Sequence, residues 1–162
     1  MKLIAVDPGY ERIGIAVLER DTKKKEVLIF SECFKTSAKL SFGERLKAIG
    51  EEIARVMKEY KPESLAIEKL YFAKNQTTAM GVAEARGVII YECARTSIPI
   101  YEYTPMEIKV AVGGHGKASK DDVLSMTAKL ITLPKNKKMI DDEIDAIAIG
   151  LTCFARERFP NQ

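Results

Sequence analysis

The sequence is poor in residues that bind zinc. It has one histidine, His115, and its three cysteines are far apart and form no Cys-x-x-Cys pair: Cys33, Cys93 and Cys153. Because a structural zinc site needs four closely spaced thiolates or imidazoles, we expect no such site. Each cysteine lies among apolar residues, so we expect buried free thiols of the kind found in a reducing cytosol.

Long apolar runs are also missing. No segment approaches the roughly 20 apolar residues of a membrane-spanning helix, and the apolar run at the N-terminus is too short for a secretory signal peptide. We therefore expect a cytoplasmic protein that does not contact a membrane. No linker, repeat or low-complexity stretch divides the 162 residues. We predict one domain over residues 1–157 and a short C-terminal tail at 158–162.

The net charge of +3 is too small to indicate a nucleic-acid partner by itself. The distribution of the charge is more informative. Residues 109–138 contain seven lysines, opposed only by Asp121 and Asp122. Such a local excess of positive charge favours phosphate binding, although a solvated lysine-rich surface has the same composition. Charge alone leaves both interpretations open.

Hydrophobic periodicity predicts an α/β fold. Apolar or alternating runs predict strands near residues 3–6, 13–18, 27–34, 65–67 and 98–103. Helical spacing and capping residues predict helices at 42–57, 77–94, from 104, from 119 and at 141–156. The first three strands, joined by short turns, indicate an antiparallel meander. The later alternation of strands and helices predicts a mixed five-stranded sheet flanked by helices.

Two acidic residues stand where such a sheet binds its ligands. Asp7 and Glu68 each follow a predicted strand, and ligand sites in these folds lie at the carboxyl ends of strands. Both acids are also compatible with a simple change of chain direction, since Asp7 precedes the turn-forming pair Pro8-Gly9. Their position is therefore a first indication of a site.

The last predicted helix carries acids that are harder to explain structurally. Asp141, Asp142 and Glu143 suit the positive end of the helix dipole. Asp145 follows them on an otherwise apolar helix, where an unpaired carboxylate is costly and a bound cation would offset the cost. Asp142 and Asp145, three residues apart, can face one point, and the spacing of Asp141 and Asp145 permits the same.

Carboxylates without histidine or thiolate partners suit a hard divalent cation better than zinc. Mg²⁺ usually binds through a few carboxylates together with substrate phosphate. Two such ions about 4 Å apart can activate water and stabilise the leaving oxygen in phosphodiester cleavage. The acids therefore predict metal-dependent phosphodiester chemistry.

The order and spacing of several short motifs resemble the RuvC Holliday junction resolvases. These motifs are Asp7-Pro8-Gly9 with Gly14, Ala66-Ile67-Glu68, Ala73-Lys74-Asn75, Ala85-Arg86-Gly87 and Asp142-x-x-Asp145-Ala146-x-Ala148. The resemblance runs from about Met1 to about Ala155. It implies a ribonuclease H-like fold and a homodimer that cuts four-way DNA junctions by paired, symmetric, Mg²⁺-dependent nicks in homologous recombination and DNA repair.

The resemblance also implies which acids are catalytic and bind metal. They are Asp7, Glu68, Asp142 and Asp145, with Asp142 preferred to Asp141 because the family spacing is Asp-x-x-Asp. Two Mg²⁺ ions per active site are implied, with Mn²⁺ as a substitute. The RuvA–RuvB branch-migration complex is the implied protein partner.

Five further residues are implied to bind DNA. Lys109 and Lys120 match lysines near the scissile phosphate, whereas Lys117 lies in a glycine-rich loop that departs from the family pattern. Tyr71 matches an aromatic residue that holds the opened junction, and the adjacent Phe72 is placed to share that contact. An aromatic residue that closes a hydrophobic edge is the structural alternative.

Arg86 and Gly87 match a family helix at or near the dimer interface, and the resemblance gives Arg86 no catalytic role.

Three other functions fit parts of the whole pattern. A ribonuclease H-like nuclease that acts on RNA or RNA–DNA hybrids would have a similar acidic cluster. An actin-like ATP-binding protein also begins with a strand followed by Asp-x-Gly, but it needs further phosphate loops and usually a second domain. A non-catalytic junction-binding protein would tolerate loss of the acids.

Overall fold

The computed structural model describes residues 1–21, 25–70, 76–134 and 138–159, with the backbone alone at 76–78. Its centre is a five-stranded sheet in the order β3-β2-β1-β4-β5. The strands are β1 (Lys2–Asp7), β2 (Arg12–Arg20), β3 (Glu26–Lys35), β4 (Ser64–Glu68) and β5 (Ile100–Tyr103). The first three form an antiparallel meander, and β4 and β5 run parallel to β1. The mixed sheet predicted from the sequence is therefore confirmed.

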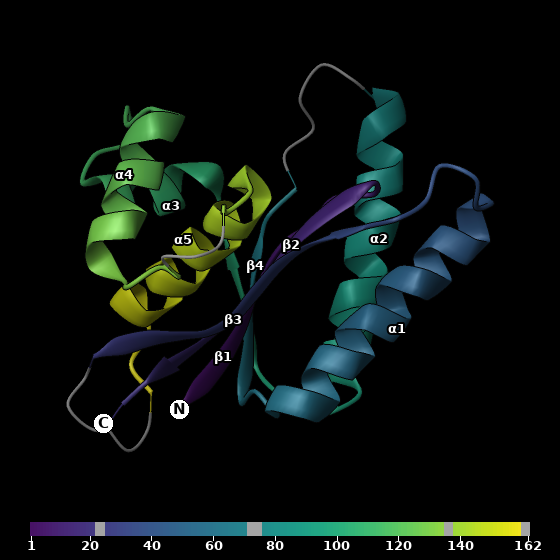
Figure 1. The fold of residues 1–162 in the computed structure, drawn as a ribbon, viewed down its shortest axis with the longest axis horizontal. Helices are drawn as coiled ribbons and strands as arrows, with labels where there is room; N and C mark the ends of the chain where they lie inside the picture. The colour runs from purple at the N-terminus through teal and green to yellow at the C-terminus, as the bar shows by residue number, and fades with distance from the viewer. Residues whose placement is uncertain (22–24, 71–75, 135–137, 160–162) are drawn as a thin grey trace.

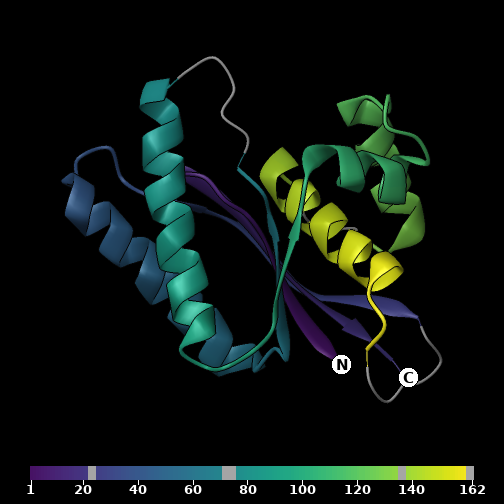
Figure 2. The ribbon, with the colours of Figure 1, turned by 180° about the vertical axis from the view of Figure 1, so that it is seen from behind.

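Helices cover both faces of this sheet (Figure 1). In the described ranges they are α1 (Phe42–Tyr60), α2 (Gln76–Ala94), α3 (Pro105–Gly113), α4 (Lys120–Leu130) and α5 (Asp141–Arg156). The view from behind shows α1 and α2 on one side and α3, α4 and α5 on the other (Figure 2). None of the described helices is long and apolar enough to cross a bilayer.

Strand β1 is apolar throughout because both of its faces are covered. Its alternate residues enter different cores: Leu3 and Ala5 pack towards α5, and Ile4 and Val6 pack towards α1 and α2. All four side chains are fully buried. The strand is thereby held rigidly up to Asp7, its last residue.

One predicted strand boundary was wrong. Strand β5 begins at Ile100 rather than at residue 98, because Pro99 has no N–H to donate and joins the sheet only through its carbonyl, which accepts from the Leu65 amide. Phe159, assigned to the tail, is buried and packs edge-on against Tyr101 and Phe154. The core therefore extends past residue 157.

The three cysteines are free thiols. Cys93 and Cys153 are buried, as expected, but Cys33 is only partly buried because its strand, β3, lies at the edge of the sheet. Its sulfur lies 3.6 Å from a carboxylate oxygen of Asp142. Cys33 therefore borders the acidic region described below.

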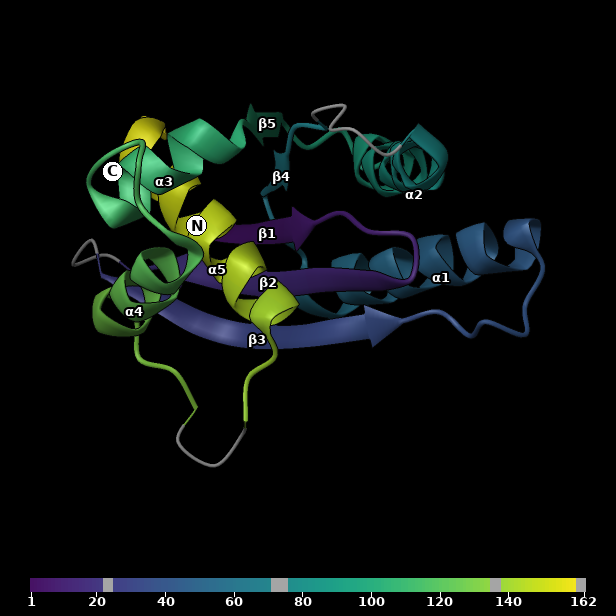
Figure 3. The ribbon, with the colours of Figure 1, turned by 90° about the horizontal axis from the view of Figure 1, so that it is seen from above.

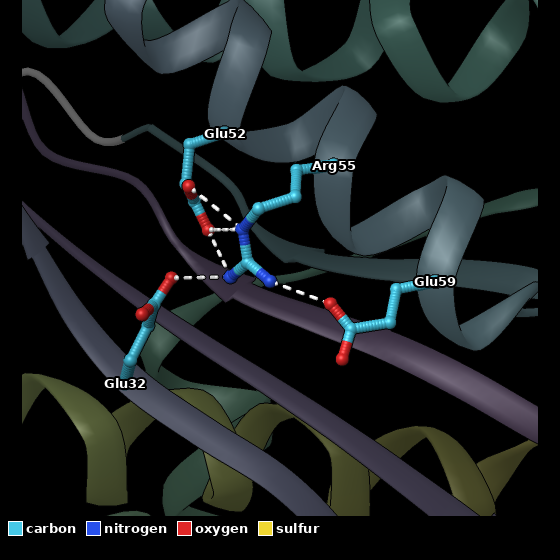
Figure 4. Close-up of polar contacts among 4 residues, drawn as sticks. All are labelled: Glu32, Glu52, Arg55 and Glu59. Carbon is cyan, nitrogen blue, oxygen red and sulfur yellow. Dashed lines mark hydrogen bonds and ion pairs between the residues drawn. The ribbon is translucent and has the colours of Figure 1, made fainter.

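A charged cluster joins β3 to α1 (Figure 4). The Arg55 guanidinium lies 2.5 Å from Glu52, 2.7 Å from Glu59 and 3.4 Å from Glu32. Burial, followed by the hydrogen bond and charge of Glu52, raises the pKa of Glu32 to about 7. Although burial opposes it, hydrogen bonds with Arg55 and Glu32 keep the pKa of Glu52 below its ordinary value.

Glu32→Gln is expected to stabilise the protein at pH 8 but not at pH 4. Because the pKa of Glu32 is higher in the folded chain, its ionisation destabilises the fold increasingly from about pH 4.5 to about pH 7. The side chain is 30% exposed, so solvent screening limits the gain to less than about 1 kcal/mol. Urea unfolding at both pH values measures it, with Glu59→Gln as the control. An equal gain at both pH values would contradict the assignment.

Candidate active site

Two carboxylates lie side by side at one edge of the sheet. Strands β1 and β4 are parallel neighbours whose pairing ends at Val6 and Ile67. The next residue of each strand is an acid, Asp7 on β1 and Glu68 on β4. The two acids predicted from separate sequence motifs are thus brought together by the parallel pairing.

Helix α5 brings the other acids to the same edge. It packs over β1 and β2 (Figure 3), and its first turn lies against Gly14, which pairs with Asp7 in the sheet. A Cβ atom at Gly14 would lie 1.9 Å from the carbonyl oxygen of Asp142 and 3.2 Å from the Cβ of Asp7. Only glycine permits this approach, so Gly14 allows α5 to place Asp142 and Asp145 beside the strand ends.

The four acids are close enough to influence one another's ionisation. Burial raises the pKa of Asp7 to about 7, with further increases from the charges of Glu68, Asp145 and Asp142. Burial also raises the pKa of Glu68 to about 7, followed by the charge of Asp145. The pKa of Asp145 is raised mainly by burial, against the opposing effect of Lys120. Concentrated negative charge in a buried setting is typical of a site that binds a cation.

Two basic side chains neutralise part of this charge. The Lys120 ammonium lies 3.1 Å from Asp145 and 3.6 Å from Asp141. Arg12, at the start of β2, pairs with the carboxylate of Asp142. Within the described part of the chain, Asp7 and Glu68 make no ion pair. Of the four acids, Asp7 and Glu68 therefore retain the greatest need for a cation.

The acids do not form a ready-made metal cage. Among the described residues, no three acidic, histidine or cysteine side chains make a group that could hold a metal ion as they stand. Their mutual effects on pKa nevertheless place the carboxylates close together. In this structure the carboxylates of Asp142 and Asp145 are paired with Arg12 and Lys120. The donor set still suits Mg²⁺, because it consists of oxygens alone and two of its members, Asp7 and Glu68, are partly buried and make no ion pair with a described residue.

A cavity of about 200 Å³ opens beside the acids. Its polar lining combines Glu68 and Asp145 with the ammonium-bearing side chains of Lys109 and Lys120, and the remaining wall is apolar. A second cavity of about 310 Å³ shares Lys109 and Pro105 with the first. Carboxylates and lysines facing one cavity suit a metal-bound phosphate, because the metal and the phosphate need ligands of opposite charge.

A sequence profile described as Crossover junction endodeoxyribonuclease RuvC matches residues 3–153. The chain belongs to this RuvC family. The RuvC of Thermosipho melanesiensis is 39% identical over 159 residues, covering 98% of this chain and 100% of that one. The RuvC of Petrotoga mobilis is 40% identical over 159 residues, covering 98% of this chain and 94% of that one.

Solved RuvC structures match the fold as well. The RuvC structure of Thermus thermophilus has a TM-score of 0.85 and 31% identity, covering 95% of this chain and 94% of that one. A structure of T. thermophilus RuvC in complex with a Holliday junction substrate has a TM-score of 0.87 and 30% identity, covering 96% and 93%. The ribonuclease H-like fold expected from the resemblance is confirmed.

The DNA-binding residues expected from the RuvC resemblance have different positions. Lys109 and Lys120 line the cavity beside the acids. Lys117 is exposed in the loop before α4 and is not among the residues that line either cavity. Tyr71 and Phe72 lie outside the described residues. The structure therefore brings two of the five to the acids.

Sequence reasoning missed two arginines of this RuvC site. Arg12 pairs with Asp142 across 130 positions of the chain. Arg86 donates from Nε to the backbone carbonyl of Glu68 at 3.0 Å. The only signal for Arg12 was its position just after the Asp7-Pro8-Gly9 turn, and Arg86 was noted as part of a motif but assigned to an interface. Neither partner is visible without the tertiary structure.

Proposed function

We propose that this protein is an endonuclease that resolves four-way DNA junctions by paired, symmetric nicks in homologous recombination and DNA repair. One observation carries the proposal: Glu68 at the end of β4, Asp145 on α5 and two lysines share a single cavity in a RuvC fold. Family membership adds the substrate class, since a RuvC of similar fold has been solved with a Holliday junction. The junction is our proposed partner on both grounds.

The proposed catalytic and metal-binding residues are Asp7, Glu68, Asp142 and Asp145. Their oxygens suit two Mg²⁺ ions, with Mn²⁺ as a substitute. When bound, the metal supplies an activated water and stabilisation of the leaving oxygen. The pKa values of Asp7 and Glu68 are each raised to about 7, so a metal held by these two carboxylates would bind more tightly as the pH rises through neutrality.

The lysines are proposed to hold the scissile phosphate. Lys120 is 56% exposed and pairs with Asp145, which lines the same cavity. An exposed ammonium can leave a carboxylate for a phosphate at little cost, since such pairs are weak in water. Lys109, which also lines this cavity, offers a second positive charge. Together they offset negative charge that develops on the phosphate.

We also propose a homodimer, because two like strands of a two-fold junction need two sites related by two-fold symmetry. Met80 and Tyr91, both on α2, are 65% and 62% exposed, which supports an interface on this helix.

Tyr71, Phe72 and Lys117 are proposed as further junction contacts on the family resemblance alone. The same resemblance is the basis for proposing RuvA–RuvB as a partner and the cytoplasm as the location.

A substrate panel tests the function. The protein is mixed with a labelled four-way junction, a linear duplex and an RNA–DNA hybrid, each in Mg²⁺ and in EDTA. We expect symmetric nicks in the junction alone, only with Mg²⁺, and their loss in Asp145→Asn. Cleavage of the hybrid would instead favour a ribonuclease H-like activity. Junction cleavage that persists in EDTA would exclude the metal mechanism.

A further inference from the structure

Arg86 connects three elements that meet at the acidic edge of the sheet. Its helix, α2, lies beside the β4–β5 edge (Figure 3). The Nε atom donates to the carbonyl of Glu68, the last residue of β4, at 3.0 Å. The Nη2 atom pairs with the carboxylate of Glu102 on β5. One guanidinium thereby joins a helix to two neighbouring strands.

The hydrogen bond from Arg86 to Glu68 lies where β4 is paired with a neighbouring strand on one side only. Pairing between β4 and β1 ends at Ile67, one residue earlier. On its other side β4 still pairs with β5, where Glu68 is in register with Tyr103. Arg86 therefore supplies a donor at the point where the strand bearing Glu68 loses one of its two neighbours.

Burial makes this contact well defined. The Arg86 side chain is 17% exposed, and both of its partners belong to the same chain. The family resemblance placed this residue near a dimer interface, but its guanidinium is directed inward, to β4 and β5. A planar guanidinium can donate in two fixed directions at once, whereas a lysine ammonium acts as a single point charge.

We propose that Arg86 is a positioning residue for the nuclease reaction: by holding the Glu68 backbone and anchoring to Glu102, it sets where the Glu68 carboxylate meets the metal and the substrate phosphate. This inference rests on the proposed function. It assigns Arg86 a role through Glu68 and no contact with the DNA. Residues that orient metal ligands in this way typically contribute about 10- to 100-fold to metal affinity or activity.

Arg86→Lys tests the proposal, because it keeps the charge and removes the two-way donation. We expect Mn²⁺ binding to the protein alone, followed by electron paramagnetic resonance, to weaken by about 10-fold, and junction cleavage to slow by a similar factor. Junction affinity in EDTA and the melting temperature are expected to stay close to those of the wild type. Glu102→Gln is expected to have a smaller effect in the same direction, since the bond to Glu68 remains.

Arg95→Lys is the matched control. Arg95 lies just beyond the end of α2, is 60% exposed and pairs with Glu92, so the same substitution there is expected to change none of the measurements. The proposal is overturned if Arg86→Lys binds Mn²⁺ and cuts as the wild type does. It is also overturned if metal binding, junction binding and melting temperature all fall together, because that result indicates general unfolding. If the wild type cuts no junction, the proposed function fails, and Mn²⁺ binding still decides the role of Arg86.

Discussion

Asp7→Asn is expected to abolish junction cleavage while making the metal-free protein more stable. The amide removes one of the proposed metal-binding oxygens at the meeting point of β1, β4 and α5. We expect activity to fall by more than about 100-fold, since residues that only orient a metal ligand already contribute about 10- to 100-fold. Binding of the junction in EDTA should persist, because the lysines are unchanged.

The stability effect follows from the raised pKa of Asp7. Its pKa rises from an ordinary 3.8 to about 7, first because of burial and then because of neighbouring acids. The ionised carboxylate therefore destabilises the folded chain increasingly from about pH 4 to about pH 7, and by a constant amount above that. At about 1.4 kcal/mol per pKa unit, we expect Asp7→Asn to gain roughly 2–4 kcal/mol at pH 8 and little at pH 4.

Denaturant unfolding in EDTA at pH 4 and pH 8 measures this gain. Adding Mg²⁺ should stabilise the wild type at pH 8 and should stabilise Asp7→Asn much less, because ligand binding to the folded state alone adds stability. A variant that is less stable than the wild type at pH 8 would show that Asp7 is a structural acid. An active Asp7→Asn would remove this residue from the proposed mechanism.

Gly14→Ala is expected to reduce stability and activity together. The new Cβ would lie 1.9 Å from the Asp142 carbonyl and 2.6 Å from its carbon, and backbone atoms cannot yield as a flexible side chain does. Helix α5 must therefore move away from β2, taking Asp142 with it. Forced expansion of a well-packed contact typically costs about 1–3 kcal/mol, and a shift of about 1 Å at a catalytic group can cost about 100-fold in rate.

Gly43→Ala is the matched control for this experiment. Gly43 lies in the first turn of α1, and a Cβ there would meet nothing within 4 Å. Since alanine favours a helix over glycine by up to about 1 kcal/mol, this variant should be equally active and slightly more stable. Urea unfolding and junction cleavage of both variants give the comparison. Full activity in Gly14→Ala would mean that the approach of α5 to β2 is not needed for the reaction.

The type and order of the helices and strands could be predicted from the sequence because both depend on interactions between residues that are close in the chain. Alternation and capping need only residues a few positions apart. Ser41 and Glu44 form a capping box at α1, and Thr104 and Glu107 form another at α3. The burial of Phe159 could not be predicted in this way, because its ring packs against Tyr101 and Phe154, which are distant in the chain or on another element.

The acidic residues were found from the sequence because they break the pattern around them. Asp7 and Glu68 end apolar strands, and Asp145 interrupts an apolar helix. The lysines do not break a local pattern, and the family resemblance alone set Lys109 and Lys120 apart from Lys117. The fold adds a physical difference, because Lys109 and Lys120 line the cavity beside the acids and Lys117 is exposed in the loop.

By itself, the sequence determined that this protein is a mixed α/β domain with acids at two strand ends and on its last helix, because periodicity and charge are properties of neighbouring residues. The tertiary structure decided which groups meet: Arg12 with Asp142, Lys120 with Asp145, and Arg86 with the Glu68 backbone. These contacts depend on strand pairing and on the close approach of α5 at Gly14. Their partners lie from 18 to 130 positions apart in the chain, so that only the folded packing brings them together.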